Sequence, residues 1–225
     1  MTTANETNRA GTAGEARIAG IVLVATTLLS ILMMAHHPTA STHEPASLAA
    51  DLAGKATLSR VVHGALIAMI GLELYAFVVF AGRIANGRSA ARAGLVAYAI
   101  GAGAMMGAAL ISGFVMSSLA AYYAGAADPA PFVDFARLSM TGNQALANLG
   151  VFAMSTAIVL WSIALLHDRA RGRWLAIVGF VTGLAPAIAL AAGAIRLDVH
   201  GMLLVVVAQA VWNLAAGIEM IRGRI

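Results

Sequence analysis

Six continuous apolar runs, each bounded by charged or turn-forming residues, constrain this chain more than any other feature. They cover residues 18–35, 61–81, 94–121, 146–166, 174–195 and 202–221. A helix needs about 20 apolar residues to cross the roughly 30 Å hydrocarbon core of a bilayer, so each run is long enough to span a membrane. Lipid offers the backbone no hydrogen-bond partners, and the runs lack the alternation of barrel strands, so helices are expected. The sequence therefore predicts an all-α polytopic membrane protein, a bundle of six transmembrane helices.

The composition agrees with this class and excludes several kinds of chemistry. Of the 225 residues, 60% are hydrophobic and 11% are charged, whereas soluble domains carry about 25% charged residues. The absence of cysteine excludes disulfides, thiolate metal sites, iron–sulfur clusters and cysteine nucleophiles. The net charge of +4 comes from basic residues dispersed in short loops, so we expect the lipid bilayer as a partner and no nucleic acid.

The distribution of lysine and arginine predicts the orientation of the helices. With the N-terminus in the cytoplasm, ten of the 14 basic residues lie in cytoplasmic segments, as the positive-inside rule requires. Both termini are then cytoplasmic, residues 1–17 form a disordered tail, and residues 18–225 form the transmembrane domain. Trp161 and Trp174 are expected to anchor the chain at the inner membrane interface. The four basic residues on the outer side are Lys55, Arg60, Arg137 and Arg196.

Two long outer loops are predicted to carry short amphipathic segments. In residues 36–60, two prolines are followed by leucines among small residues, which favours a short surface helix leading into the second span. In residues 122–145, Phe132, Phe135 and Leu138 recur every three residues. We expect this second segment to lie flat across the outer end of the bundle.

Small and polar residues predict how the helices meet. Helices in lipid approach closely where small residues recur at a spacing of four, as at Gly103 and Gly107 and at Gly179 and Gly183. Such glycine- and alanine-rich faces could also join two copies into a homo-oligomer. Polar side chains follow one face of the fourth span and others lie midway along the sixth, where they either hydrogen-bond between helices or line a substrate or ion path. These residues are Gln144, Asn148, Ser155 and Ser162, and Gln209, Trp212 and Asn213.

Three short motifs carry a family resemblance. They are the Arg17-Ile18-Ala19-Gly20 opening, the Arg173-Trp174-Leu175 entry to the fifth span with Gly179, and the closing stretch of residues 208–217 with Glu219. In layout the chain resembles a family of uncharacterised bacterial multi-pass membrane proteins, a domain of unknown function. The resemblance implies six spans and a location in the bacterial inner membrane. It implies no catalytic residues and leaves open whether the protein is an enzyme.

Histidines gather at the predicted outer ends of the spans. His36 and His37 end the first span, His63 lies about one turn into the second, and His200 begins the sixth. Because these four share a similar depth, they could converge on a transition metal such as zinc, copper or iron. Haem ligation through His63 and His200 is less expected, since paired axial ligands usually lie deeper. The alternatives are histidines that merely solvate the helix ends, and a proton-responsive or substrate-binding cluster.

Glu73 is the sharpest anomaly, because it lies midway along the second span. An ionisable group there costs about 2.5 to 3.5 kcal/mol on insertion, so its side chain should face the bundle interior and be paired or protonated. The polar face of the fourth span, with Asn148, and Asn213 of the sixth are its expected partners. We therefore predict a ligand pocket that opens to the non-cytoplasmic side and contains Glu73, Asn148, Asn213, His63 and His200.

Three functional classes follow from these observations. The first is a membrane protein whose histidine-lined pocket binds a metal or a small ligand. The second is a small carrier that uses Glu73 in the bundle interior, although the six spans show no internal repeat of the kind many carriers possess. The third is a non-catalytic membrane protein that acts through partners.

Overall fold

The structure is a computed structural model, and it describes residues 3–42, 44–85, 89–126, 128, 130–166 and 172–225. Within these ranges the chain is helical almost throughout and contains no strand. In chain order the elements are α1 (Thr3–Ala35), α2 (Pro45–Gly54), α3 (Ala56–Ala85), α4 (Ser89–Leu110), the π-helix η1 (Ile111–Val115), α5 (Met116–Tyr123), α6 (Ala130–Leu166), α7 (Arg173–Ala191) and α8 (Val199–Ile221).

Six helices of the described chain are long and apolar enough to cross a membrane, with α4, η1 and α5 counted as one. This confirms the predicted all-α polytopic bundle. The first of them, α1, begins upstream of the predicted span, at Thr3. The division into a disordered tail of residues 1–17 and a transmembrane domain of residues 18–225 stays a prediction.

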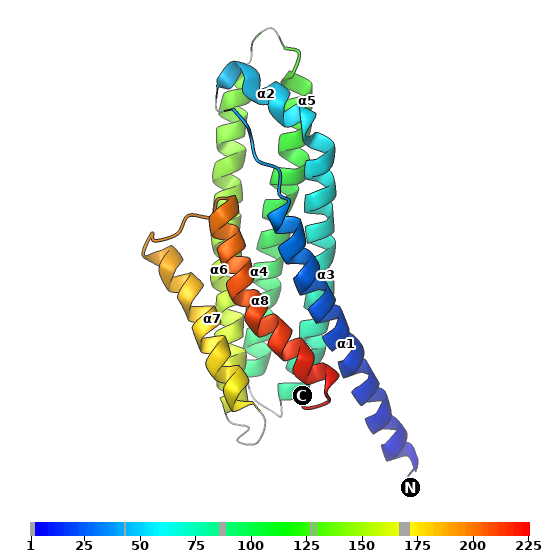
Figure 1. The fold of residues 1–225 in the computed structure, drawn as a ribbon. Helices are drawn as coiled ribbons and strands as arrows, with labels where there is room; N and C mark the ends of the chain where they lie inside the picture. The colour runs from blue at the N-terminus through cyan, green and yellow to red at the C-terminus, as the bar shows by residue number, and fades with distance from the viewer. Residues whose placement is uncertain (1–2, 43, 86–88, 127, 129, 167–171) are drawn as a thin grey trace.

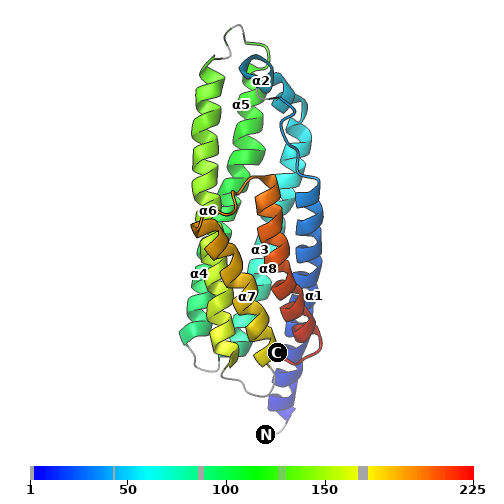
Figure 2. The same cartoon turned by 60° about the vertical axis from the view of Figure 1, so that its left-hand side comes forward.

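The six long helices form a closed ring. Along the ring, α1 packs against α3, α3 against α4, α4 against α6, α6 against α7, α7 against α8, and α8 against α1. Both termini lie at one end of the bundle, and α2 lies at the opposite end, which we call the distal end (Figures 1 and 2). This common end for the termini is what an even number of spans requires.

Two of the six helices, α7 and α8, are shorter than the other four. The 37 residues of α6 correspond to about 55 Å and the 19 residues of α7 to about 28 Å at 1.5 Å per residue. Figures 1 and 2 show α7 and α8 ending part of the way along α6. A bilayer of roughly 30 Å that matches α7 therefore leaves about 25 Å of α6 projecting at the distal end.

The projecting part corrects one sequence prediction. Residues 122–145 do not form a flat segment, because residues 130–145 are the first half of α6 and stand upright on the fourth span. Phe132 and Ala136 are buried there against Ala49 of α2 and Met116 and Ala120 of α5. The surface helix predicted in residues 36–60 is present as α2, with Pro45 in its first turn, where a missing N–H is tolerated.

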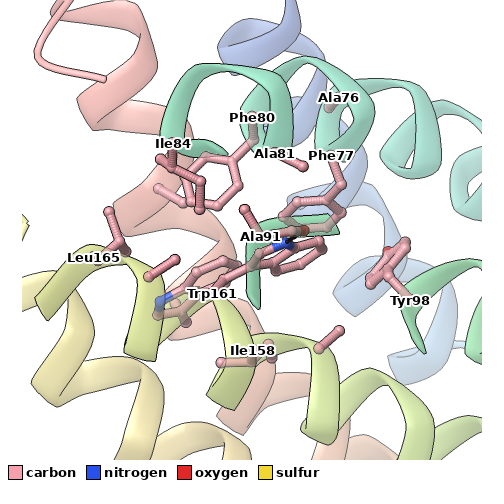
Figure 3. Close-up of a cluster of buried hydrophobic side chains, with 14 of the residues drawn as sticks. Ala76, Phe77, Phe80, Ala81, Ile84, Ala91, Tyr98, Ile158, Trp161 and Leu165 are labelled. Carbon is pink, nitrogen blue, oxygen red and sulfur yellow. Dashed lines mark hydrogen bonds between the residues drawn. The ribbon is translucent and has the colours of Figure 1, made fainter. Parts of the chain in front are cut away.

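The ring is filled by stacked aromatic side chains. Phe77 and Phe80 of α3, Tyr98 of α4, Trp161 of α6 and Trp212 of α8 belong to one buried cluster (Figure 3). The indole rings of Trp161 and Trp212 stack at 5.6 Å between centroids, and Phe77 stacks on Trp161 at 4.7 Å. The expectation that Trp161 anchors the membrane interface is therefore wrong: its ring is fully buried, and its indole N–H donates to the Ala91 carbonyl.

Only some of the glycines predicted to lie at helix contacts do so, and other glycines make close contacts that were not predicted. Gly103 has open space where a Cβ would lie, whereas Gly101 of α4 and Gly150 of α6 each lie against the other's carbonyl oxygen. Gly20 of α1 and Gly217 of α8 make a similar contact that closes the ring. Gly179 and Gly183 do lie in tight contacts, as predicted, against α6 and Trp212.

Candidate functional site

The structure brings two of the predicted histidines into direct contact. His37, just after α1, and His63, in the second turn of α3, place their Nε2 atoms 3.0 Å apart. Their rings meet edge to face, with 4.7 Å between centroids. His63 is 4% exposed and His37 is half-buried. The pair thus lies at the junction of α1 and α3, on the side toward the distal end.

Backbone carbonyls fix the tautomer of both rings. The Nδ1 of His63 lies 2.7 Å from the Ser59 carbonyl oxygen, and the Nδ1 of His37 lies 3.0 Å from the Pro38 carbonyl oxygen. A carbonyl oxygen can only accept, so each Nδ1 carries the hydrogen and donates it. Burial and the neighbouring His63 lower the pKa of His37 to about 4, which keeps this ring neutral at pH 7. The Nε2 atom of each neutral ring then carries no hydrogen, and its lone pair points at the lone pair of the other Nε2 atom.

A glycine in the π-helix makes room for His63. A Cβ on Gly113 would lie 2.4 Å from the Cβ of His63, so the ring sits where any larger residue would project. Single-turn π segments inside α-helices occur frequently at functional sites. The neighbouring Ser112 accepts a hydrogen bond from the Asn143 amide of α6, which ties the π-helix to a third helix.

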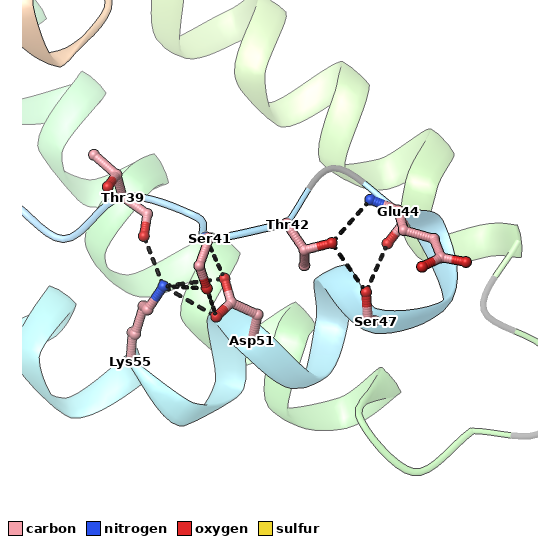
Figure 4. A network of polar contacts seen from close by, with 7 residues as sticks. All are labelled: Thr39, Ser41, Thr42, Glu44, Ser47, Asp51 and Lys55. Atoms are coloured by element: carbon pink, nitrogen blue, oxygen red, sulfur yellow. Dashed lines mark hydrogen bonds and ion pairs between the residues drawn. The ribbon is translucent and has the colours of Figure 1, made fainter.

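A polar network joins the segment that follows His37 to α2 (Figure 4). Asp51 of α2 accepts hydrogen bonds from the amide and hydroxyl groups of Ser41 and pairs with Lys55 at 3.0 Å. Lys55 also donates to the Thr39 carbonyl. The hydroxyl, amide and ammonium donors hold the pKa of Asp51 at about 2. The segment that follows His37 is thereby fastened to α2.

A small pocket of about 40 Å³ is lined by neither histidine, but some of its lining residues lie near them in the chain. Two of its lining residues, Pro38 and Ser59, are those whose carbonyls hold the histidine rings. Lys55 and Ser112 also line it. The pocket is large enough for a water molecule or two close to the histidine pair.

The other predicted histidines do not join this pair. His36 is exposed and directs its Nδ1 to the Leu32 carbonyl, and His200 is exposed in the first turn of α8. His43, also on the predicted outer side, lies outside the described residues. Within the part of the chain that the structure describes, no group of three histidine or acidic side chains is placed to hold a metal.

Glu73 faces the bundle interior, and its partners differ from those expected. The Tyr98 hydroxyl donates to its Oε2 at 3.0 Å, from α4. The hydroxyls of Thr26 and Thr27, from α1, also face the carboxyl group. Glu73 is 8% exposed.

The expected polar partners lie elsewhere. Asn148 and Asn213 are half-buried on α6 and α8. Gln144 donates to the Leu197 carbonyl, and Gln209 donates to Ser155. Ser155 of α6 therefore meets Gln209 of α8, and Gln144 of α6 meets the segment before α8.

Sequence analysis missed Tyr98, Ser59 and Gly113. Tyr98 is a polar aromatic residue well inside an otherwise apolar run, and a buried tyrosine hydroxyl usually has a partner. That signal could have connected it with Glu73. Ser59 acts through its backbone carbonyl, which no sequence pattern marks. Gly113 belongs to a row of small residues with Ala109 and Ser117, which predicts close packing but does not identify His63 as the neighbour.

Comparisons with known proteins add no assignment. No protein-family model matches the chain, and no curated protein and no solved structure matches it significantly. The resemblance to an uncharacterised membrane-protein family therefore rests on the short motifs alone. The six-helix ring identifies the chain as an integral membrane protein.

Proposed function

We propose that this integral membrane protein binds a transition metal ion between His37 and His63, at a site on the non-cytoplasmic side. The observation that carries the proposal is the pair of bare Nε2 atoms 3.0 Å apart, each on a ring whose Nδ1 donates to a backbone carbonyl. Donation from the second ring nitrogen to a carbonyl is the usual way in which proteins orient metal-binding histidines.

The separation of the two nitrogens supports a tetrahedral ion. With Zn–N bonds of about 2.0 to 2.1 Å, two ligands of one tetrahedral zinc ion lie about 3.3 Å apart. Opening the observed 3.0 Å by a few tenths of an ångström would give this geometry. Two neutral imidazoles facing each other without an ion or a shared proton would instead repel each other through their lone pairs.

Two protein ligands would leave coordination positions for water or a small ligand. A pocket lined by Pro38 and Ser59, whose carbonyls hold the two rings, supports the presence of such space near the site. Open positions distinguish catalytic and exchangeable zinc sites from closed structural ones. The non-cytoplasmic placement of the pair is supported by the arginines at the end that holds the termini, among them Arg83, Arg92, Arg222 and Arg224.

Metal binding to purified protein tests the proposal. We expect wild type in detergent at pH 7.5 to bind one zinc ion by calorimetry and to gain thermal stability from added zinc. His37→Ala and His63→Ala should each lose most of the affinity, by tenfold or more, and the ligand-field spectrum that Co²⁺ gives with wild type should be absent from both variants.

Two exposed histidines provide matched controls. His36→Ala and His200→Ala remove the same chemical group from positions outside the pair, so both variants should bind zinc as wild type does. Equal binding by all four variants, or no binding by wild type, would overturn the metal site. The second outcome would favour a proton shared between the two Nε2 atoms.

A further inference from the structure

Glu73 and the groups around it form a second buried polar cluster, separate from the histidine pair. The cluster is built by three helices: Glu73 comes from α3, Tyr98 from α4, and Thr26 and Thr27 from α1. Glu73 lies ten residues beyond His63 on α3, about 15 Å along the helix. Tyr98 is the titratable group that faces it, and within the described chain no ion pair involves Glu73.

The hydroxyl hydrogen of Thr26 is already committed. Its Oγ1 donates to the Val22 carbonyl at 2.8 Å, with the Leu23 carbonyl at 3.2 Å as a second acceptor. A hydroxyl carries one hydrogen and two lone pairs, so Thr26 can offer the carboxyl group of Glu73 only lone pairs. An ionised carboxylate also has only lone pairs. The two groups attract each other only if Glu73 carries the hydrogen.

Thr27 leaves an acceptor position open at the same place. Its Oγ1 is buried, and it makes no hydrogen bond within the part of the chain that the structure describes. A buried hydroxyl without a partner destabilises the folded chain. A protonated Glu73 could donate to this oxygen or to Thr26, and still accept from Tyr98.

We infer that Glu73 is a proton-binding site in the bundle interior, where its neutral carboxyl group donates to a threonine hydroxyl of α1 and accepts from Tyr98 of α4. This assignment gives the carboxyl hydrogen an acceptor and the carbonyl oxygen a donor, and it avoids a charge at mid-membrane. It stands independently of the metal site.

The hydrogen bond that protonated Glu73 donates would then stabilise the contact between α1 and α3. Loss of the proton would set a carboxylate against the lone pairs of Thr26 and weaken the contact between the two helices. His63 lies on α3 and His37 follows the end of α1, so both sites adjoin the contact between these two helices. Ser30 and Met69, which contact each other between the two sites, lie in the same seam.

Infrared spectroscopy tests the protonation directly. At pH 7, the wild-type spectrum should contain the carbonyl stretch of a carboxylic acid, and Glu73→Gln should remove it. Tyr98→Phe should move this band to higher frequency, because the carbonyl oxygen loses its hydrogen-bond donor. A wild-type spectrum without the band, or a band that survives in Glu73→Gln, would overturn the proposal.

Glu219 supplies a matched control. It is also buried, but it forms ion pairs with Arg222 and Arg224, so Glu219→Gln should remove no carboxylic acid band. If Glu73→Gln fails to fold, wild-type protein can be labelled with a hydrophobic carbodiimide, which adds to protonated carboxyl groups in apolar surroundings. Mass mapping should find the adduct on Glu73, and an adduct absent from Glu73 would overturn the inference.

Discussion

At the scale of the single residue, the histidine site depends on a side chain that is absent. His63 occupies the space that a Cβ on Gly113 would need, and the π-helix brings that glycine to the ring. Gly103 lies on α4 with open space at the same position. The two glycines look alike in the sequence, but only one of them is required by its neighbour.

Gly113→Ala should therefore destabilise the protein while Gly103→Ala should not. The added methyl group at Gly113 must displace His63, and overpacking of this kind costs roughly 1 to 3 kcal/mol. At Gly103 the methyl group meets nothing within 4 Å, and the gain in helix propensity is about 0.5 to 1 kcal/mol. Thermal denaturation of both variants in one detergent checks this; equal melting temperatures would contradict it.

At the scale of the element, α2 and the segment before it act as one clamped unit. Asp51 binds Ser41 and Lys55, and Lys55 reaches back to the Thr39 carbonyl, so the chain after His37 is fixed to α2 (Figure 4). The position of His37 beside His63 depends in part on this clamp.

The clamp should make stability depend on pH in the acid range. Folding lowers the pKa of Asp51 from 3.8 to about 2, so its contribution is complete above pH 4 and is lost as the pH falls from about 4 to 2. Asp51→Asn should accordingly melt below wild type at pH 7, and the difference should shrink toward pH 2. Melting temperatures of both proteins across this range give the measurement. A difference that stays constant with pH would show that Asp51 acts through its shape rather than its charge.

The sequence predicted those helices whose bounds are marked by a change in hydropathy. It did not predict helical segments that contain charged and polar residues. The six spans and the helix after Pro45 follow from apolar length and from proline placement. The first half of α6 contains Asp134, Arg137 and Asn143, which hydropathy excludes from a span. Helix continuity is set by backbone hydrogen bonds, which run through these polar residues without a break. The upright projection of α6 could therefore not be read from a hydropathy pattern.

At the scale of the whole molecule, the contacts between helices could not be predicted from the sequence. Depth along each span is readable, so His37 and His63 were placed at one level and Glu73 in the interior. The rotation of each helix about its axis is set by packing, as is its position in the ring. That is why His200 lies away from the pair, Trp161 lies in the core, and Tyr98 rather than Asn148 meets Glu73.

The orientation of the ring in the membrane can be tested because the chain has no cysteine. Ser89→Cys places a thiol at the start of α4, at the end that holds the termini, and Gly125→Cys places one at the distal end; both positions are exposed. A membrane-impermeant maleimide added to intact cells should label Gly125→Cys and leave Ser89→Cys unlabelled until the membrane is permeabilised. The reverse pattern would mean that the histidine pair faces the cytoplasm.

The contact between Gly20 and Gly217 joins the first helix to the last, and this has a consequence for biosynthesis. A ribosome delivers α1 to the membrane before α8. Until α8 arrives, α1 lacks one of its two neighbours and the aromatic cluster lacks Trp212. The ring can therefore close only after α8 has been synthesised and inserted, and a nascent chain that stops before α8 keeps one side of α1 uncovered.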